Sequence, residues 1–386
     1  MQLCNLKTIE HGELVAVGIR GGIITNCSPS SANRDAVDCD TAIFFDDAMV
    51  FPGLINSHDH LDFNVFPPLS NRTFRNYQEW GADIHGSNTE AIQAVLKIPQ
   101  DLRTQWGLYK NLLNGITTVV NHGKRLPVDN ELISVIQNHH CLHSVQFEKR
   151  WKTKLNNIFK YFEPVVIHIG EGIDKISHEE INELIRWNLF RRRLIGVHGV
   201  AMDGDQAKAF RALVWCPSSN TVLFDTTGPI DELKESTKIL FGTDSTLTAG
   251  WDLWQQLRAA REMLLLTDQE LFDSLTRSPA TVWGEKSIGA LAPGKTADLC
   301  VAQANGKSRF DAFFSVTPKD LLLVMHRGQI RLLDAGIKQQ MSDREIPLAS
   351  FSTICLNGRT KYVFGNLAKV ADQIRHHYPN ASFPFE

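Results

Sequence analysis

The sequence lacks the features that would place the protein in a membrane, outside the cell or on nucleic acid. No stretch approaches the roughly 18 uninterrupted apolar residues of a membrane-spanning helix, and the first residues lack the basic and apolar regions of an export signal. Lysine and arginine number 40 against 43 for aspartate and glutamate, so the formal net charge is −3. We therefore expect a cytoplasmic protein that binds neither membrane nor nucleic acid.

The cysteines do not form the sequence patterns of a disulfide framework or of a cysteine metal site. The seven cysteines include no pair with Cys-x-x-Cys spacing and stand at positions 4, 27, 39, 141, 216, 300 and 355. An odd and scattered set argues against a disulfide framework. Any metal ligands must therefore come from histidine and carboxylate side chains.

The middle of the chain alternates strand-like apolar runs with helix-length amphipathic stretches, which is typical of a parallel α/β barrel. Helices are expected between the strands, for example over 88–114 with interruptions, 179–190 and 253–266. The predicted strands are Ala48–Ile55, Ile116–Asn121, Ser144–Phe147, Val165–Ile169, Leu194–Val197, Ala212–Trp215 and Ile239–Phe241. A TIM-like (β/α) barrel normally has eight strands, so one strand is irregular or one β/α unit has been lost.

Both ends of the chain have the texture of short strands joined by turns. Such segments lie at 14–19 and 23–25, and again at 297–302, 321–326 and 329–333. Two distant β segments around a different middle predict one small β-sandwich built from both ends. The expected domains are 1–49 for the first part of the sandwich, 50–287 for the barrel, and 288–386 for the second part with a C-terminal tail.

The segment Phe51–His60 ends an apolar strand in His58-Asp59-His60. Residues two apart on a strand point to the same face, so both imidazoles would enter one space. Functional groups of a parallel barrel gather at this end of its strands. Neutral imidazoles there suit zinc, iron or another first-row ion. The alternative is a pair of ordinary histidines at the start of a loop.

Three later strands also end in residues that can perform chemistry. His168 lies in one, and Glu171, three residues on, could take a proton from water and pass it to a leaving nitrogen. His198 closes the next strand, where it could reach the substrate or the attacking oxygen. Asp244 follows Ile239–Phe241, where a metal ion would offset the cost of burying its charge. The alternatives are a core histidine, a surface glutamate and a helix N-cap, but the ordered set favours one metal-dependent site.

This order of motifs resembles the amidohydrolase superfamily, specifically the branch of cytosine and guanine deaminases, triazine hydrolases and imidazolonepropionase. The resemblance covers nearly the whole chain and runs through Pro52-Gly53, the His-x-His, Gly115–Thr118, the His-x-x-Glu, the His198 strand, Cys216–Asn220, Gly242–Asp244 and Gly289–Leu299. It implies a single divalent ion, zinc or alternatively iron, ligated by His58, His60, His168 and Asp244. It also implies that Glu171 shuttles protons and that His198 steadies the attacking water or the developing oxyanion, with Asp244 assisting the chemistry. No lysine stands where a carboxylated bridging lysine would be obvious, so a two-metal site is the weaker choice, with Lys149 as the only nearby candidate.

The predicted function is hydrolysis of non-peptide carbon–nitrogen bonds by metal-activated water, either deaminase-like or by opening a cyclic amide. The expected partner is a small nitrogen heterocycle or cyclic amide, and the expected assembly is a homodimer. The alternatives are a catalytically silent scaffold or binding protein, and a decayed family member whose barrel does not close.

Several further residues have expected roles of lesser weight. His122 is expected to be a hydrogen-bonded structural histidine rather than a substrate contact, and Ser219 and Asn220 to brace the loop after their strand. Trp80 belongs to an aromatic loop, with Phe63, Phe66, Phe74 and Tyr77, which is expected to line a lid or pack rather than stack on a planar substrate.

Overall fold

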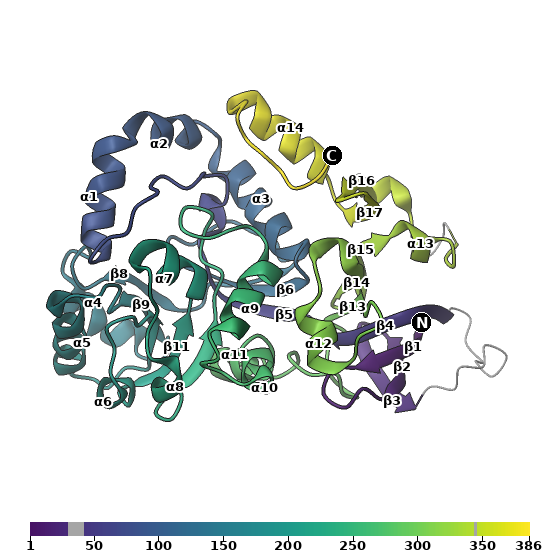
Figure 1. The fold of residues 1–386 in the computed structure, drawn as a ribbon, viewed down its shortest axis with the longest axis horizontal. Helices are drawn as coiled ribbons and strands as arrows, with labels where there is room; N and C mark the ends of the chain where they lie inside the picture. The colour runs from purple at the N-terminus through teal and green to yellow at the C-terminus, as the bar shows by residue number, and fades with distance from the viewer. Residues whose placement is uncertain (30–41, 343–345) are drawn as a thin grey trace.

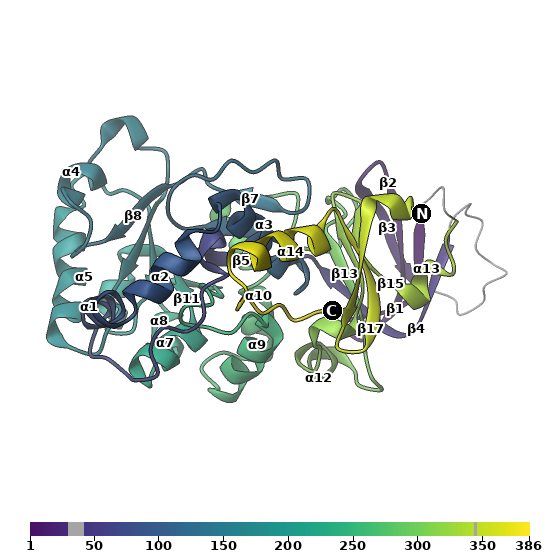
Figure 2. The same ribbon diagram turned by 90° about the horizontal axis from the view of Figure 1, so that it is seen from above.

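The structure, a computed structural model, describes residues 1–29, 42–342 and 346–386. In both views the parallel strands and most helices lie on one side, and a sheet drawn from the two ends of the chain lies on the other (Figures 1 and 2). No helix within the described ranges is long and apolar enough to cross a membrane. Cys39 lies outside those ranges, and the unpaired thiols within them include Cys27, Cys141, Cys216, Cys300 and Cys355.

The two ends of the chain join in one nine-stranded sheet with the order β16-β17-β15-β14-β13-β4-β1-β2-β3. Its strands are β1 Gln2–Thr8, β2 Leu14–Arg20, β3 Ile23–Pro29, β4 Ala42–Pro52, β13 Leu299–Gln303, β14 Leu321–His326, β15 Gln329–Asp334, β16 Phe351–Leu356 and β17 Arg359–Phe364. β4 links the two ends, because it pairs with β1 on one side and β13 on the other. The chain then turns at Gly53 directly into the first parallel strand.

The parallel strands form a sheet of three and a sheet of five, each in chain order. They are β5 Leu54–Asp59, β6 Ile116–Asn121 and β7 Ser134–Ile136 in the first, and β8 His140–Ser144, β9 Val165–Ile169, β10 Leu194–His198, β11 Phe210–Trp215 and β12 Lys238–Phe241 in the second. Most are buried along their whole length, as expected of strands covered on both faces. The expected bounds of β6 and β9 are confirmed.

The shortfall of one strand, expected from an irregular strand or a lost β/α unit, is explained by β7 and β8. Only residues 137–139 separate these strands, whereas two parallel neighbours need a crossover of about a dozen residues or more. They are therefore successive parts of one extended segment, of which β7 pairs with β6 and β8 pairs with β9. At the opposite junction the Asp244 amide donates to the His58 carbonyl at 3.0 Å, which joins the ends of β12 and β5.

The expected strand Ser144–Phe147 is wrong. The strand here is β8, which ends at Ser144, and the next three residues form a turn in which Phe147 is half exposed. The apolar pair Val145 and Phe147 suggested a strand, whereas the polar residues His140 and His143 obscured the real one.

Most helices connect or follow the parallel strands in the sequence, and the last three come later, between or after strands of the nine-stranded sheet (Figure 1). They are α1 Tyr77–Ser87, α2 Thr89–Leu96, α3 Gln100–Leu112, α4 Trp151–Leu155, α5 Lys175–Trp187, α6 Gly204–Ala207, α7 Pro217–Phe224, α8 Ile230–Leu233, α9 Leu253–Glu262, α10 Asp268–Asp273, α11 Arg277–Trp283, α12 Arg309–Phe314, α13 Ala335–Lys338 and α14 Leu367–His377. The expected helix over 88–114 is divided into α2 and α3 near Pro99. No helix lies between β6 and β7 in the described chain, which accounts for the shortness of that region.

Candidate metal centre

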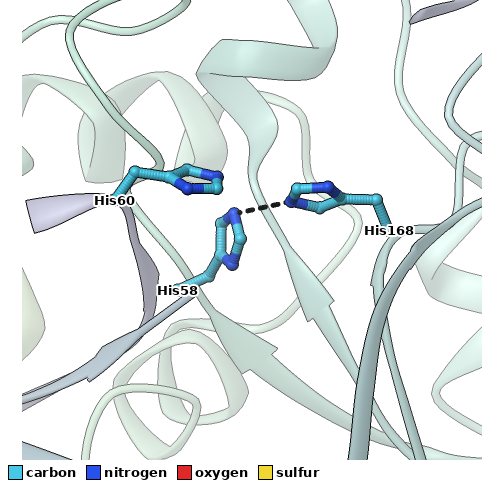
Figure 3. A group of neighbouring side chains, drawn as sticks. All are labelled: His58, His60 and His168. Atoms are coloured by element: carbon cyan, nitrogen blue, oxygen red, sulfur yellow. Dashed lines mark hydrogen bonds between the residues drawn. The ribbon is translucent and has the colours of Figure 1, made fainter. Parts of the chain in front are cut away.

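Three histidines converge at the C-terminal ends of β5 and β9 (Figure 3). His58 lies in β5, His60 follows that strand, and His168 lies in β9, with 3.3 Å between the Nε2 atoms of His58 and His168. Burial lowers the pKa of His58 and of His168 well below the usual value, so both rings are neutral and keep a lone pair. Neutral imidazoles aimed at one point are the ligands that zinc and similar ions prefer.

Asp244 completes the cluster from the loop after β12. Its Oδ1 atom lies 3.7 Å from the Nε2 atoms of both His58 and His60. Burial raises the pKa of Asp244, but His60, His198 and the hydrogen bond from Ser219 outweigh burial and hold the pKa below its usual value. The carboxylate is therefore available as an anionic ligand.

The donor atoms fit a single ion. Two ligands bound to zinc at about 2.1 Å with tetrahedral geometry lie about 3.4 Å apart. The measured separations of 3.3 and 3.7 Å agree with this value. The ligand atoms of His58, His60 and His168 all lie within 4.8 Å of one another, as do those of His58, His198 and Asp244. These residues could hold a metal ion.

The close approach of β12 to His58 depends on Gly242. A Cβ atom at this position would lie 2.7 Å from the Cβ atom of His58 and 2.8 Å from a methyl group of Val214, too close for any larger residue. Asp244 itself has a φ of +55° and His198 a φ of +72°, both in the left-handed region. Such backbone conformations cost about 1–3 kcal/mol each in non-glycine residues and persist where the surroundings impose them, often at functional sites.

Glu171 and His198 face each other beside the cluster. Glu171 Oε1 lies 3.6 Å from His198 Nε2, and both side chains are buried. Burial, followed by the charges of Asp244 and Glu180, raises the pKa of Glu171 well above its usual range. Burial therefore favours the protonated form of this carboxyl.

Ser219 and Asn220, in the first turn of α7, hold the site side chains directly. Ser219 Oγ donates to Asp244 Oδ2 at 2.8 Å, and Asn220 Oδ1 lies 2.9 Å from His198 Nδ1. The amide nitrogen of Asn220 donates to Thr227, which fixes the orientation of its oxygen toward His198. Asn220 thus braces the segment after α7, as expected, and both residues also hold side chains from elsewhere: His198 at the end of β10 and Asp244 after β12.

A buried ion pair beneath the site was not foreseen from the sequence. Lys110 of α3 lies with its Nζ atom 3.0 Å from Asp59 Oδ2, and both side chains are at most 1% exposed. Lys110 also donates to Asn64 at 2.8 Å and to the carbonyl oxygen of Asp244 at 3.2 Å, while Asn111 donates to Asp59 at 2.7 Å. The network ties α3 to the ends of β5 and β12, and so fixes the strand positions from which the histidines and Asp244 project.

Replacing Lys110 by methionine should lower the free energy of unfolding by about 3–5 kcal/mol, because the buried Asp59 side chain would lose its cationic partner. Urea unfolding of the metal-free protein would measure the change. The control is Lys208→Met, which removes an exposed ion pair with Asp205 and should leave stability nearly unchanged. Adding Asp59→Asn to Lys110→Met should recover part of the loss. Equal effects of the two lysine variants would contradict the role assigned to the pair.

Three other residues named from the sequence have clear positions. His122 stacks on His168 with ring centroids 4.2 Å apart, and neither of its ring nitrogens has a hydrogen-bond partner among the described residues. The expected hydrogen bond of the His122 ring is therefore not made to any described residue, and the ring instead packs on His168. Lys149 is exposed on the turn after β8. His143, which the misplaced strand concealed, lies in β8 with its ring centroid 5.4 Å from that of His168.

A cavity of about 690 Å³ opens onto the cluster. Its inner end is lined by His60, His168, Glu171, His198 and Asp244. Its outer part is lined by aromatic and aliphatic side chains of α1, α2, the loop after His60 and the turn after β8. Of the aromatic loop residues, Phe63, Phe66, Tyr77 and Trp80 line the cavity, whereas Phe74 packs against Val200, Leu223 and Phe224. This volume suits a small organic molecule.

Known proteins match the chain in sequence and in fold. The model of the Amidohydrolase family matches residues 152–331. The chain is 24% identical over 412 residues to the 5-methylthioadenosine/S-adenosylhomocysteine deaminases of two strains of Desulfitobacterium hafniense, covering 90% of this chain and 91% of each relative.

Solved structures share the fold over nearly the whole chain. A mutant of the atrazine chlorohydrolase TrzN from Arthrobacter aurescens, complexed with zinc and atraton, matches with a TM-score of 0.70 and 16% identity, over 97% of this chain and 99% of that one. An adenosine deaminase from Xanthomonas campestris with bound zinc matches with a TM-score of 0.70 and 15% identity, over 98% of each chain. These structures show a shared fold, and the family match and the sequence relatives support membership of the amidohydrolase superfamily.

Proposed function

We propose that the protein is a metal-dependent hydrolase of non-peptide carbon–nitrogen bonds in small nitrogen heterocycles, either a deaminase or a cyclic amide hydrolase. One observation carries the proposal: His60, His168 and Asp244 line the inner end of one cavity together with Glu171 and His198. Metal ligands beside a protonatable carboxyl form the arrangement that hydrolysis of such bonds requires. The deaminase names of the sequence relatives favour deamination.

We propose that His58, His60, His168 and Asp244 hold one divalent ion. Zinc is the first choice, since two solved relatives are described with zinc, and iron is the alternative. When bound, such an ion supplies Lewis-acid activation of the attacking water and of the substrate. The second oxygen of Asp244 accepts hydrogen bonds from Ser219 and Thr248, which hold the carboxylate in place.

Glu171 is proposed to move the proton. Its raised pKa allows the carboxyl to accept a proton from the attacking water at one oxygen and to deliver it to the departing nitrogen. The leaving nitrogen departs only when protonated, so the same group serves both halves of the reaction.

His198 is proposed to orient the attacking water. Because Asn220 presents an oxygen to Nδ1, that nitrogen carries the proton of the neutral ring and Nε2 is left as an acceptor. Nε2 faces Glu171 and the cavity, where it can accept a hydrogen bond from water. This tautomer favours contact with the water over stabilisation of an oxyanion, which needs a donor.

We also propose how the parallel sheets and the nine-stranded sheet are organised into domains. The two parallel sheets are proposed to form a closed (β/α) barrel with seven strand positions over residues 50–287, since β7 and β8 occupy one position and β12 meets β5. Residues 1–49 and 288–386 are proposed to form the β-sandwich. An apolar cluster that includes Leu6, Val17, Phe45, Val301 and Leu323 supports it, because these side chains pack together from both ends of the chain.

The proposed function is tested by elemental analysis of purified protein, followed by a screen of the zinc-loaded protein for ammonia release or ring opening. The screen should include aminated purines, pyrimidines and triazines, together with cyclic amides. We expect about one ion per chain and turnover of at least one class. A metal-loaded protein that turns over none of them would favour the silent scaffold, and a protein without metal would contradict the ligand assignment.

A further inference from the structure

The outer part of the cavity has a chemical character of its own. Large apolar side chains line it, among them Phe66, Leu69, Trp80, Ile84, Leu96 and Phe147. Leu96, at the end of α2, is 43% exposed, and Phe147, after β8, is 49% exposed. Exposed apolar side chains around a cavity mouth mark a surface that a ligand covers.

Charge is missing from this surface. No lysine or arginine lines the cavity among the described residues, and its only carboxylates are Glu171 and Asp244 at the reacting end. A phosphate or carboxylate placed there would lose its hydration without gaining a cation. A sugar diol would find no free carboxylate to accept its two hydrogen bonds. Gln78, His85 and His143 can hydrogen-bond an uncharged group.

The volume leaves room beyond the reacting ring. A cavity of about 150 Å³ is enough to hold benzene. A single heterocycle at the metal centre would therefore leave most of the 690 Å³ to another part of the substrate. That remaining space is the apolar part next to α1 and α2.

We infer that the substrate heterocycle carries an uncharged apolar substituent that fills the space between α1, α2 and Phe147. The inference rests on the proposed function, because it takes the metal centre as the reacting end. It assigns selectivity to the cavity wall: alkyl or aryl substituents are accepted, and phosphorylated, carboxylated or ribosylated heterocycles are rejected.

Gly81 provides a steric test of this space. It lies within α1 and lines the cavity, and a Cβ atom there would meet Phe147 at 3.5 Å, an ordinary contact. A larger residue therefore fits without backbone strain and projects into the proposed binding space. Leucine also favours a helix more than glycine, so Gly81→Leu should fold.

The experiment uses zinc-loaded protein and three aminotriazines that differ only in one N-substituent: methyl, n-butyl or 3-carboxypropyl. Calorimetry gives the affinity of each, and ammonia release gives kcat/KM. The butyl compound should bind about tenfold or more tighter than either of the others. Gly81→Leu should weaken the butyl compound about tenfold and the methyl compound by less than about threefold.

A charge variant provides the converse test. Leu96→Arg should improve binding of the carboxypropyl compound about tenfold, whereas Leu264→Arg, at an exposed leucine outside the cavity, should not. Tight binding of the butyl compound, with no turnover of any compound here or in the wider screen, would refute the proposed function and leave the inferred ligand class intact. Wild-type protein that prefers the carboxypropyl compound, or fails to bind the butyl compound, would overturn the inference.

Discussion

Glu171→Gln is expected to lower turnover by about 10²- to 10⁴-fold while the metal content stays at the wild-type level. Glutamine preserves the shape of the side chain but cannot carry a proton between the water and the departing nitrogen. Because Glu171 lies beside His198 and outside the expected ligand set, the ion should be retained. Steady-state kinetics on a substrate from the screen, combined with elemental analysis of the same sample, measures both quantities.

Glu179→Gln is the matched control, because Glu179 is an exposed glutamate on α5 that pairs with Lys175 at 3.2 Å. Its turnover should equal that of the wild type. Full activity in Glu171→Gln would remove Glu171 from the mechanism. Loss of metal in that variant would instead identify the carboxylate as a ligand.

His168→Ala is expected to weaken zinc binding by roughly 10²- to 10³-fold and to abolish turnover. Four-ligand zinc sites bind with about 10–16 kcal/mol, so each ligand contributes about 3 kcal/mol. Competition with a chromogenic chelator would measure the affinity, and ammonia release would measure the activity.

His122→Ala is the control that distinguishes loss of a metal ligand from loss of packing between the histidine rings. His122 stacks on His168 but belongs to neither group of converging metal-binding atoms. Its removal should leave zinc affinity within about tenfold of the wild type, the range typical of weak supporting contacts. Equal losses in both variants would show that His168 acts through packing of the histidine cluster rather than as a ligand.

The strand ends and their functional residues could be predicted because an apolar run and the residues that follow it are adjacent in the sequence. β6 and β9 have the expected bounds, and His58, His168 and Asp244 converge as their positions at strand ends imply. β7 could not be read, since it is three residues long and only half-buried. Its continuation into β8 is a matter of pairing with two different neighbours, which no local pattern encodes.

The residues that hold the site side chains in place could not be identified from local sequence patterns either. Lys110 and Asp59 are 51 positions apart, and neither occurs in a motif that specifies the other. Ser219 and Asn220 stood out as a motif, but their partners on β10 and after β12 became evident only from the packing of strands. Residues that act through a distant partner need the three-dimensional structure to be identified.

The hydrogen bond between the Asp244 amide and the His58 carbonyl has a consequence for how the protein matures. Among the proposed ligands, His58 comes first in the chain and Asp244 last, and this hydrogen bond places them side by side. The proposed ligand set can therefore be complete only after residue 244 has been synthesised and has packed against the end of β5. Metal binding then stabilises the completed fold relative to incomplete ones, since a bound metal stabilises only the state that binds it. Withholding zinc during synthesis should therefore lower the yield of native protein more than removing it afterwards.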